Sequence, residues 1–424
     1  MEPEQSNRIK KQKILILLCC LVYSFAYAGR YSYNANITPI INFYNVSNKE
    51  AGLIGSFFFF AYGAGQLLNA IFCKYYNKKY IIPAALCASV AINAVMFFCP
   101  PFWTIKFLWL LNGICQSVLW PTLLQVLGES IDESMTRWAV LAMSASILIG
   151  TFVAYGGSAL FNLGSFFRGS FLLGILLMAA IGIIWLLFYG TLTAEKPVLK
   201  KEAQSAANEG KERVVRTMTA ALIGLLAVCA IFAIVDNFIK DGFNTWMPKI
   251  LKDQFGFGDS IAIVLTLVLP FFGVFGSMLA MRTNKWLKDF RTLMGFFYLI
   301  LSVCLCGLLF SMRKNVLIPF LLCQGAISCL LHAINAVLTA IMPLALREKM
   351  NSGFLAGLMN TFCYVGSTAS SYGLGAISDH AGWDAAIITL LATAAGAMVL
   401  AAIVTVINVL HRKKTEKTEN EVAL

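Results

Sequence analysis

The chain has 424 residues, of which 59% are hydrophobic and only 13% are charged. Soluble domains carry about 25% charged residues, so this composition excludes an ordinary soluble protein and indicates one that crosses a membrane many times. The formal net charge is +12, but the placement of the basic residues argues against a nucleic-acid partner.

Twelve apolar stretches are each long enough to cross a bilayer, which takes about 20 residues. Each is predicted to be a helix, because lipid cannot satisfy backbone N–H and C=O groups and the stretches lack the alternation of a barrel strand. The predicted spans are residues 14–36, 51–72, 80–99, 105–127, 138–161, 169–190, 217–239, 260–281, 292–311, 316–343, 352–377 and 385–410.

The first predicted span contains a cation, Arg30, and no acid. A cation at the centre of a membrane helix costs about 2.5–3.5 kcal/mol, so it needs an explanation. The nearest acid along the chain is Glu50, in the loop that follows. Tyr23 and Tyr27 precede Arg30 by seven and three residues and share one stripe of the helix with it.

The second predicted span carries Tyr62 near its middle. Tyrosine hydroxyls that face inward can donate hydrogen bonds to an anion. A tyrosine stripe is also compatible with simple helix packing, and the pattern alone leaves both interpretations open.

Residues 191–216 are polar, charged and free of aromatic side chains, which predicts a linker between two halves. We expect one six-helix bundle over 1–190, a second over 217–411 and a tail over 412–424. With a cytoplasmic N-terminus, the inner segments carry 24 Lys and Arg and the outer ends carry 7. This asymmetry predicts a cell-membrane protein, inner or plasma membrane, with both termini in the cytoplasm.

The two predicted halves resemble each other. The segment LNGICQ around Gly113 has a counterpart in LCQGAIS around Gly325, and Arg30 has a counterpart in Lys240 at the seventh span. The basic start and the segment AYA at 26–28 also resemble a signal peptide, but its removal would leave eleven spans and break this symmetry. The sequence therefore predicts an all-α membrane protein with twelve transmembrane helices in two pseudo-symmetric halves, with substrate bound between them.

Lys240 differs from Arg30 in having acids on its own helix. Asp236 lies four residues earlier on the same face, and Asp241 is adjacent. Either both cations reach the outer interface with their long side chains, or both face a central cavity and share an anion. The symmetric placement favours the cavity, and the planar fork of arginine suits a phosphate or carboxylate.

His332 is the one histidine inside a predicted span. It suits either proton coupling or a hydrogen-bonded role in helix packing. The twelve cysteines show no CxxC pair and no metal-ligand spacing. We expect no metal, no cofactor, no catalytic residues and no enzymatic activity.

Five segments in chain order carry a family resemblance: YSFAYAGR, FAYG, LNGICQSVLWP, IKDGFNTWMP and FCYVGSTASSYGLGAISDHAGWD. Together they resemble the organophosphate:phosphate antiporters of the major facilitator superfamily, which include glycerol-3-phosphate and hexose-phosphate transporters. The similarity spans nearly the whole chain. It implies the major facilitator fold and a phosphorylated substrate.

The resemblance also implies a substrate site, which would consist of Arg30, Tyr23, Tyr27, Tyr62, Lys240 and Tyr364. The surrounding positions depart from the family pattern. Gln66 replaces a lysine, Ser146 a histidine and Asn237 a tyrosine. We expect Gln66, one helical turn from Tyr62, to help select the substrate, because an amide donates hydrogen bonds without adding charge.

We predict a monomeric transporter that moves a small phosphorylated organic anion by alternating access, in exchange for inorganic phosphate. One alternative is a proton-coupled organic-anion symporter that uses Arg30 with His332 or Asp236. A second alternative is a transporter-like sensor that binds a sugar phosphate and passes no flux.

Overall fold

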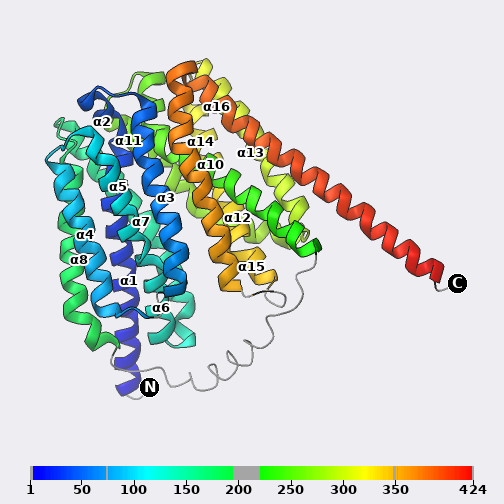
Figure 1. Cartoon of the computed structure of the whole chain (residues 1–424), viewed down its shortest axis with the longest axis horizontal. Helices are drawn as coiled ribbons and strands as arrows, with labels where there is room; N and C mark the ends of the chain where they lie inside the picture. The colour runs from blue at the N-terminus through cyan, green and yellow to red at the C-terminus, as the bar shows by residue number, and fades with distance from the viewer. Residues whose placement is uncertain (1–2, 73–74, 194–219, 347–349, 351, 423–424) are drawn as a thin grey trace.

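The computed structural model describes residues 3–72, 75–193, 220–346, 350 and 352–422, and every regular element in these ranges is a helix (Figure 1). Eleven helical stretches are long and apolar enough to cross a membrane. The last of them, Phe354–Leu410, has non-helical backbone at Gly382, with φ 76° and ψ 177°. Gly382 therefore separates two spans, and the predicted count of twelve is confirmed.

The first six spans lie in helices α1 to α8, and a short helix, α2, follows the first of them. The fourth span consists of α5 and α6, and the 3-10 turn η2 precedes the fifth. The bounds are α1 Pro3–Ala35, α2 Ile37–Tyr44, α3 Asn48–Phe72, α4 Lys78–Phe97, α5 Phe102–Ser117, α6 Leu119–Ser130, η2 Glu133–Met135, α7 Thr136–Leu163 and α8 Gly169–Thr193.

The second six spans lie in helices α10 to α16. The eighth span is formed by α11 and α12, and the tenth by α14, the π-helical turn η3 and α15. The bounds are α10 Ala220–Phe255, α11 Asp259–Thr266, α12 Val268–Trp286, α13 Phe290–Arg313, α14 Leu317–Ala336, η3 Val337–Ile341, α15 Met342–Ala345 and α16 Ser352–Val422.

Two boundaries differ clearly from the sequence prediction. The seventh span was expected to end at residue 239, but α10 continues to Phe255. The charged pair Lys240 and Asp241 made this segment look like a helix end, whereas Asp241 is 8% exposed and Met247 is fully buried inside the bundle. The predicted linker, 191–216, lies outside the described residues beyond Thr193, and α16 continues into the expected tail as far as Val422.

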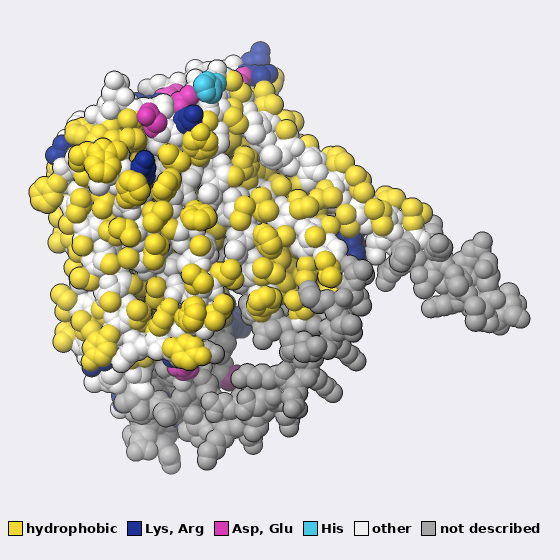
Figure 2. Space-filling model, viewed as in Figure 1, with side chains coloured by type: hydrophobic (Ala, Val, Ile, Leu, Met, Phe, Trp, Pro, Cys, Tyr) yellow, Lys and Arg dark blue, Asp and Glu magenta, His cyan; other side chains and the backbone are white. Residues whose placement is uncertain are grey.

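The two halves lie side by side, with the N-terminus at one end of the bundle and α2 at the other (Figure 1). We call these the N-terminal end and the α2 end. Between the halves, α3 packs along α16 and α7 packs against α11. Hydrophobic side chains cover the middle of the visible face, and the coloured charged side chains gather towards its two ends (Figure 2), as expected for a protein surrounded by lipid.

Candidate functional site

Arg30 lies inside the bundle and is 5% exposed, so it does not reach the membrane interface. Five aromatic rings surround its guanidinium carbon, with centroids 4.6 to 5.6 Å away. These residues, which we call the aromatic cage, are Tyr27, Tyr31, Phe58, Phe59 and Tyr62. A desolvated cation–π contact is worth about 2 kcal/mol, so the cage offsets much of the cost of placing this cation in the membrane.

No carboxylate within the described part of the chain forms an ion pair with Arg30. Its Nη1 is buried without a hydrogen-bond partner. Glu50, the nearest acid along the chain, instead accepts from the backbone N–H of Ser47 at 2.9 Å and forms a capping box at the start of α3. The aromatic faces stabilise the charge of Arg30 but leave its N–H donor available to a ligand.

A chain of hydrogen bonds starts beside the aromatic cage and crosses to the second half. The hydroxyls of Tyr23 and Tyr62 lie 3.2 Å apart, and the Gln66 side chain donates to the Tyr62 hydroxyl at 3.0 Å. Asn360 of α16 donates to the side-chain oxygen of Gln66. Gln66 is therefore one turn from Tyr62, as the sequence predicts, and it also links α3 to α16.

Small residues bring the helices of this region close together. A Cβ on Gly150 of α7 would lie 2.5 Å from the Cβ of Tyr27, and one on Gly63 of α3 would lie 2.5 Å from the Cβ of Tyr364. The Tyr364 ring consequently lies 5.0 Å from the Tyr62 ring, centroid to centroid. Tyr364, from the second half, thus joins the tyrosines around Arg30.

Three tyrosine hydroxyls in this region are also free to bind a ligand. Tyr27, Tyr31 and Tyr364 make no hydrogen bond through their hydroxyls to any described residue. Tyr27 lies within electrostatic reach of both Arg30 and Lys240. The site therefore presents several unused donors near Arg30, and such a set suits an oxyanion.

Lys240 lies near the middle of α10 and is partly buried. Across the residues that the structure describes, its ammonium has no hydrogen bond and no ion pair within 4.0 Å, even though Asp236 is one turn away. Asp241 accepts a hydrogen bond from the Ser367 hydroxyl, and Asp236 accepts one from Asn335 at 3.2 Å. Lys240 is thus not neutralised by a direct ion pair.

Three further predicted residues are engaged differently. Ser146 is fully buried and donates to the carbonyl of Met143 in its own helix at 2.6 Å. Asn237 is 4% exposed, and its side-chain oxygen accepts no hydrogen bond from the residues that the structure describes. The Nδ1 of His332 lies 2.9 Å from the carbonyl of Ser328, so it carries the proton and donates.

The packing around His332 explains its position. A Cβ on Gly273 or Gly276 of α12 would lie 2.7 or 2.6 Å from His332 atoms, so two glycines make room for the histidine between α14 and α12. His332 also lies within electrostatic reach of Lys240. This geometry favours the packing interpretation over the proton-coupling one.

Sequence reasoning missed several residues of the site. Phe58 and Phe59 come from the run FFFF directly before Tyr62, and the spacing of Phe58, four residues before Tyr62, would have placed it on the same helix face. Asn335 and Asn360 are polar residues within apolar stretches, and this is the one feature of the sequence that could have indicated them.

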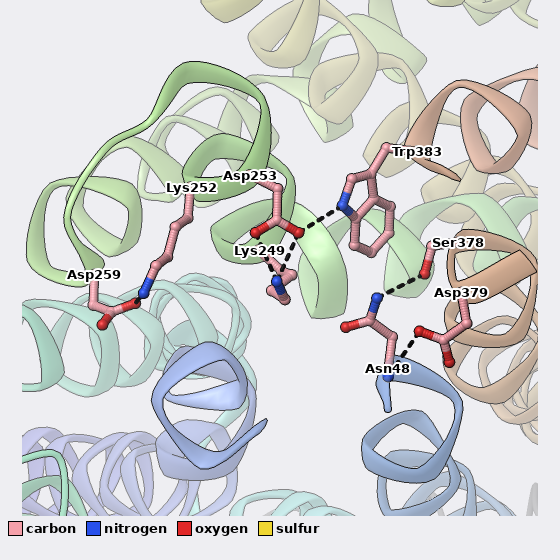
Figure 3. Close-up of polar contacts among 8 residues, drawn as sticks. All are labelled: Asn48, Lys249, Lys252, Asp253, Asp259, Ser378, Asp379 and Trp383. Carbon is pink, nitrogen blue, oxygen red and sulfur yellow. Dashed lines mark hydrogen bonds and ion pairs between the residues drawn. The ribbon is translucent and has the colours of Figure 1, made fainter. Parts of the chain in front are cut away.

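The halves are joined at the α2 end. Asn48 of α3 contacts Ser378 and Asp379 of α16, and nearby Asp253 accepts from both Lys249 and the Trp383 indole (Figure 3). Three more contacts join the halves towards this end: Tyr155 donates to the Asn244 carbonyl, Asn34 donates to Thr245, and Ser260 donates to the Ala159 carbonyl. These contacts close the α2 end of the bundle.

The model of the Major Facilitator Superfamily matches residues 19–371, and the chain belongs to this family of transporters. It is similar to solved structures of the family. One is the inward-facing, occupied crystal structure of a bacterial homolog of the human lysosomal transporter Spinster, with a TM-score of 0.70, 14% identity and 92% of this chain and 96% of that chain covered. This likeness confirms the fold.

The curated relatives include sugar-phosphate proteins. The "Probable hexose phosphate transport protein" of Chlamydia pneumoniae is 23% identical over 413 residues, 89% of this chain and 88% of the relative. The "Membrane sensor protein UhpC" of Salmonella typhimurium is 21% identical over 419 residues, 93% of this chain and 91% of the relative. These matches confirm the predicted resemblance to the organophosphate:phosphate antiporters.

Proposed function

We propose that the protein moves a small phosphorylated organic anion, of the sugar-phosphate or glycerol-phosphate type, across the membrane in exchange for inorganic phosphate. The observation that carries this proposal is the state of Arg30, which is 5% exposed and has a buried Nη1 without a partner. Lys240, from the other half, also has no ion pair within the described part of the chain. The names of the relatives support a phosphorylated ligand.

The phosphoryl group binds between these two cations. Charge-assisted hydrogen bonds to phosphate are about twice as strong as neutral ones. The free hydroxyls of Tyr27, Tyr31 and Tyr364 complete the set of donors. Because one cation belongs to each half, an anion bound to both draws the halves together. The α2 end then opens when the N-terminal end closes. This is alternating access with the substrate as the link.

The positive-inside rule gives the orientation. The N-terminal end, with its basic loops, faces the cytoplasm of a cell or inner membrane, and the α2 end faces outward. We propose that the protein works as a monomer, since each chain contains both cations of the site.

A membrane sensor is the second candidate. The Salmonella typhimurium relative, which the match covers to 91% of its length, is described as a membrane sensor protein. A sensor binds the ligand through the same donors and passes no flux. The proton-coupled symporter has weaker support, because His332 packs against two glycines and donates to a backbone carbonyl.

Liposomes with the purified full chain test the proposal. Vesicles preloaded with inorganic phosphate or glucose 6-phosphate are expected to take up labelled glucose 6-phosphate, and empty vesicles are not. Equal uptake by empty vesicles that depends on a proton gradient would favour the symporter. Binding of glucose 6-phosphate without counterflow would favour the sensor.

A further inference from the structure

Two acceptor atoms on α10, one turn before Lys240, are buried without a hydrogen-bond partner among the described residues. They are Oδ1 of Asp236, a residue with 0% exposure, and Oδ1 of Asn237, a residue that is 4% exposed. A phosphate bound to the two cations would not pair with these acceptors either, because a phosphate dianion has no hydrogen-bond donor.

Asp236 is held in place but not neutralised. Its Oδ2 accepts from the Asn335 side chain at 3.2 Å, and Asn335 also lies 3.7 Å from the sulfur of Cys363. Among the described residues no cation lies within 4.0 Å of the Asp236 carboxylate. Asp241, by contrast, accepts from Ser367, and none of its oxygens is buried without a partner.

Arg30 and Lys240 carry two positive charges, and the side chains of Asp236 and Asp241 match them when both are ionised. The site then has no net charge before any ligand arrives. A phosphate monoester adds a charge of about −1.5 to −2. A substrate with no other charge would therefore leave the site strongly negative in a poorly solvated place, where an unpaired carboxylate is costly.

We infer that Asp236, with Asn237 beside it, binds a protonated amine of the substrate, so that the transported compound carries both a phosphate and an ammonium group. An ammonium has three donors and no acceptor, which matches two unpartnered acceptors, and its charge offsets that of Asp236. This inference rests on the proposed function, since it assumes that the phosphate of the same compound binds to Arg30 and Lys240.

The substrate class is thus a phosphorylated amino compound, such as an amino sugar phosphate. The neighbouring positions fit this reading, because Asn335 holds the carboxylate from the side of α14 and Lys240 lies one turn along α10. A hydroxyl at the same place also donates a hydrogen bond, but it leaves the negative charge of Asp236 uncompensated.

Binding to the purified full chain tests the inference with three ligands that share the phosphate and the ring: glucose 6-phosphate, glucosamine 6-phosphate and N-acetylglucosamine 6-phosphate. The wild type is expected to bind glucosamine 6-phosphate at least about tenfold more tightly than either analogue without an ammonium group, the gain of one charge-assisted hydrogen bond. Equal affinities for glucose 6-phosphate and glucosamine 6-phosphate would overturn the inference and leave the proposed function standing.

The variant Asp236→Asn is expected to lose the preference for the amine while still binding inorganic phosphate, which also shows that it is folded. Asp241→Asn is the matched control: it removes the same charge from the same helix, but its carboxylate is already bonded to Ser367. The control is expected to keep the preference.

Three further results would overturn the inference. One is loss of the preference in both variants, which would indicate a general charge effect. Another is uptake of glucose 6-phosphate that is driven by a proton gradient and abolished in Asp236→Asn, since the partner of the carboxylate would then be a proton. The last is failure of the wild type to bind inorganic phosphate and all three ligands, which would overturn the proposed function as well.

Discussion

Asp379 of α16 accepts a hydrogen bond from the backbone N–H of Asn48, the first residue of α3, at 3.0 Å. The same carboxylate accepts from the N–H of Lys49 at 2.7 Å. The next N–H, of Glu50, bonds to the Ser47 hydroxyl at 3.2 Å. The free N–H groups at the start of α3 are therefore satisfied, two of them by a residue of the other half. This cap exists only while the α2 end is closed.

Asp379→Ala is expected to shift the protein towards a form that is open at the α2 end. Loss of a helix N-cap costs about 0.5–2 kcal/mol, which changes the ratio of closed to open forms by about 2- to 30-fold. Faster hydrogen–deuterium exchange in residues 244–250 of α10, where Asn244 and Thr245 contact the first half, would show the shift.

The matched control is Asp384→Ala, which lies five residues further along and pairs with Arg313 of its own half at 2.6 Å. It removes a carboxylate without touching α3, so exchange in 244–250 is expected to stay as in the wild type. Equal exchange in the two variants would mean that the Asp379 cap does not hold the α2 end closed.

Gly52→Ala is expected to open the same end by a different route. A Cβ on Gly52 would overlap the carbonyl oxygen of Ser371, which belongs to α16. Separation of the halves relieves this overlap, so the variant should remain folded with an unchanged Tm but exchange faster in residues 244–250.

Gly366→Ala serves as the comparison. Its Cβ would overlap the carbonyl oxygen of Ile234, and both residues lie in the second half. No movement between the halves relieves that overlap, so this variant is expected to lower Tm. A fall in Tm of the same size for Gly52→Ala would indicate that α3 and α16 do not separate.

Much of the fold and part of the site could be predicted from the sequence. The twelve spans follow from apolar length, and the tyrosines that share a stripe with Arg30 follow from helical periodicity. Tyr23 and Tyr62 are both buried, with 5% and 1% exposure. Local patterns were sufficient because each of these features depends on one helix.

The contacts between helices could not be predicted in this way. Asn360 meets Gln66 across 294 positions of chain, and no pattern within one helix specifies that partner. The length of α10 was also missed, since Lys240 and Asp241 resemble a helix end when their burial is unknown. The partners of polar residues buried between helices depend on how the whole bundle packs, and hydropathy does not describe that packing.

Replacement of Gln66 by a charged residue is expected to change the affinity for phosphate, with a cation raising it and an anion lowering it. Its side chain donates to the Tyr62 hydroxyl, and the Tyr62 ring lies 4.6 Å from the guanidinium of Arg30. Gln66→Lys adds a cation to this region and should tighten binding of inorganic phosphate more than it alters recognition of the sugar. Binding of inorganic phosphate and of glucose 6-phosphate by calorimetry measures both effects.

Gln66→Glu is the control of nearly identical shape. A carboxylate cannot donate to Tyr62 and supplies Arg30 with the acid that it lacks, so it should weaken phosphate binding at least about tenfold. If both variants bind phosphate as the wild type does, Gln66 serves only to join α3 to Asn360.

Arg30→Lys is expected to insert normally but to bind and exchange phosphorylated ligands at least about tenfold less well. The charge is retained, so the cost of insertion changes little. The geometry is lost, because lysine is a point charge on a flexible stem, whereas a planar guanidinium can donate to two oxygens at once. Labelled substrate binding and counterflow, measured on protein of normal expression and Tm, check this outcome.

Lys240→Arg is the reverse substitution, from lysine to arginine, at the position of the second half that corresponds to Arg30. It should have a milder effect than Arg30→Lys, because it adds donors where Lys240 now makes no ion pair among the described residues. Unchanged affinity in a well-folded Arg30→Lys protein would contradict the proposed site. It would mean that the cage of Tyr27, Tyr62 and their neighbours stabilises a structural cation, and that the anion binds elsewhere.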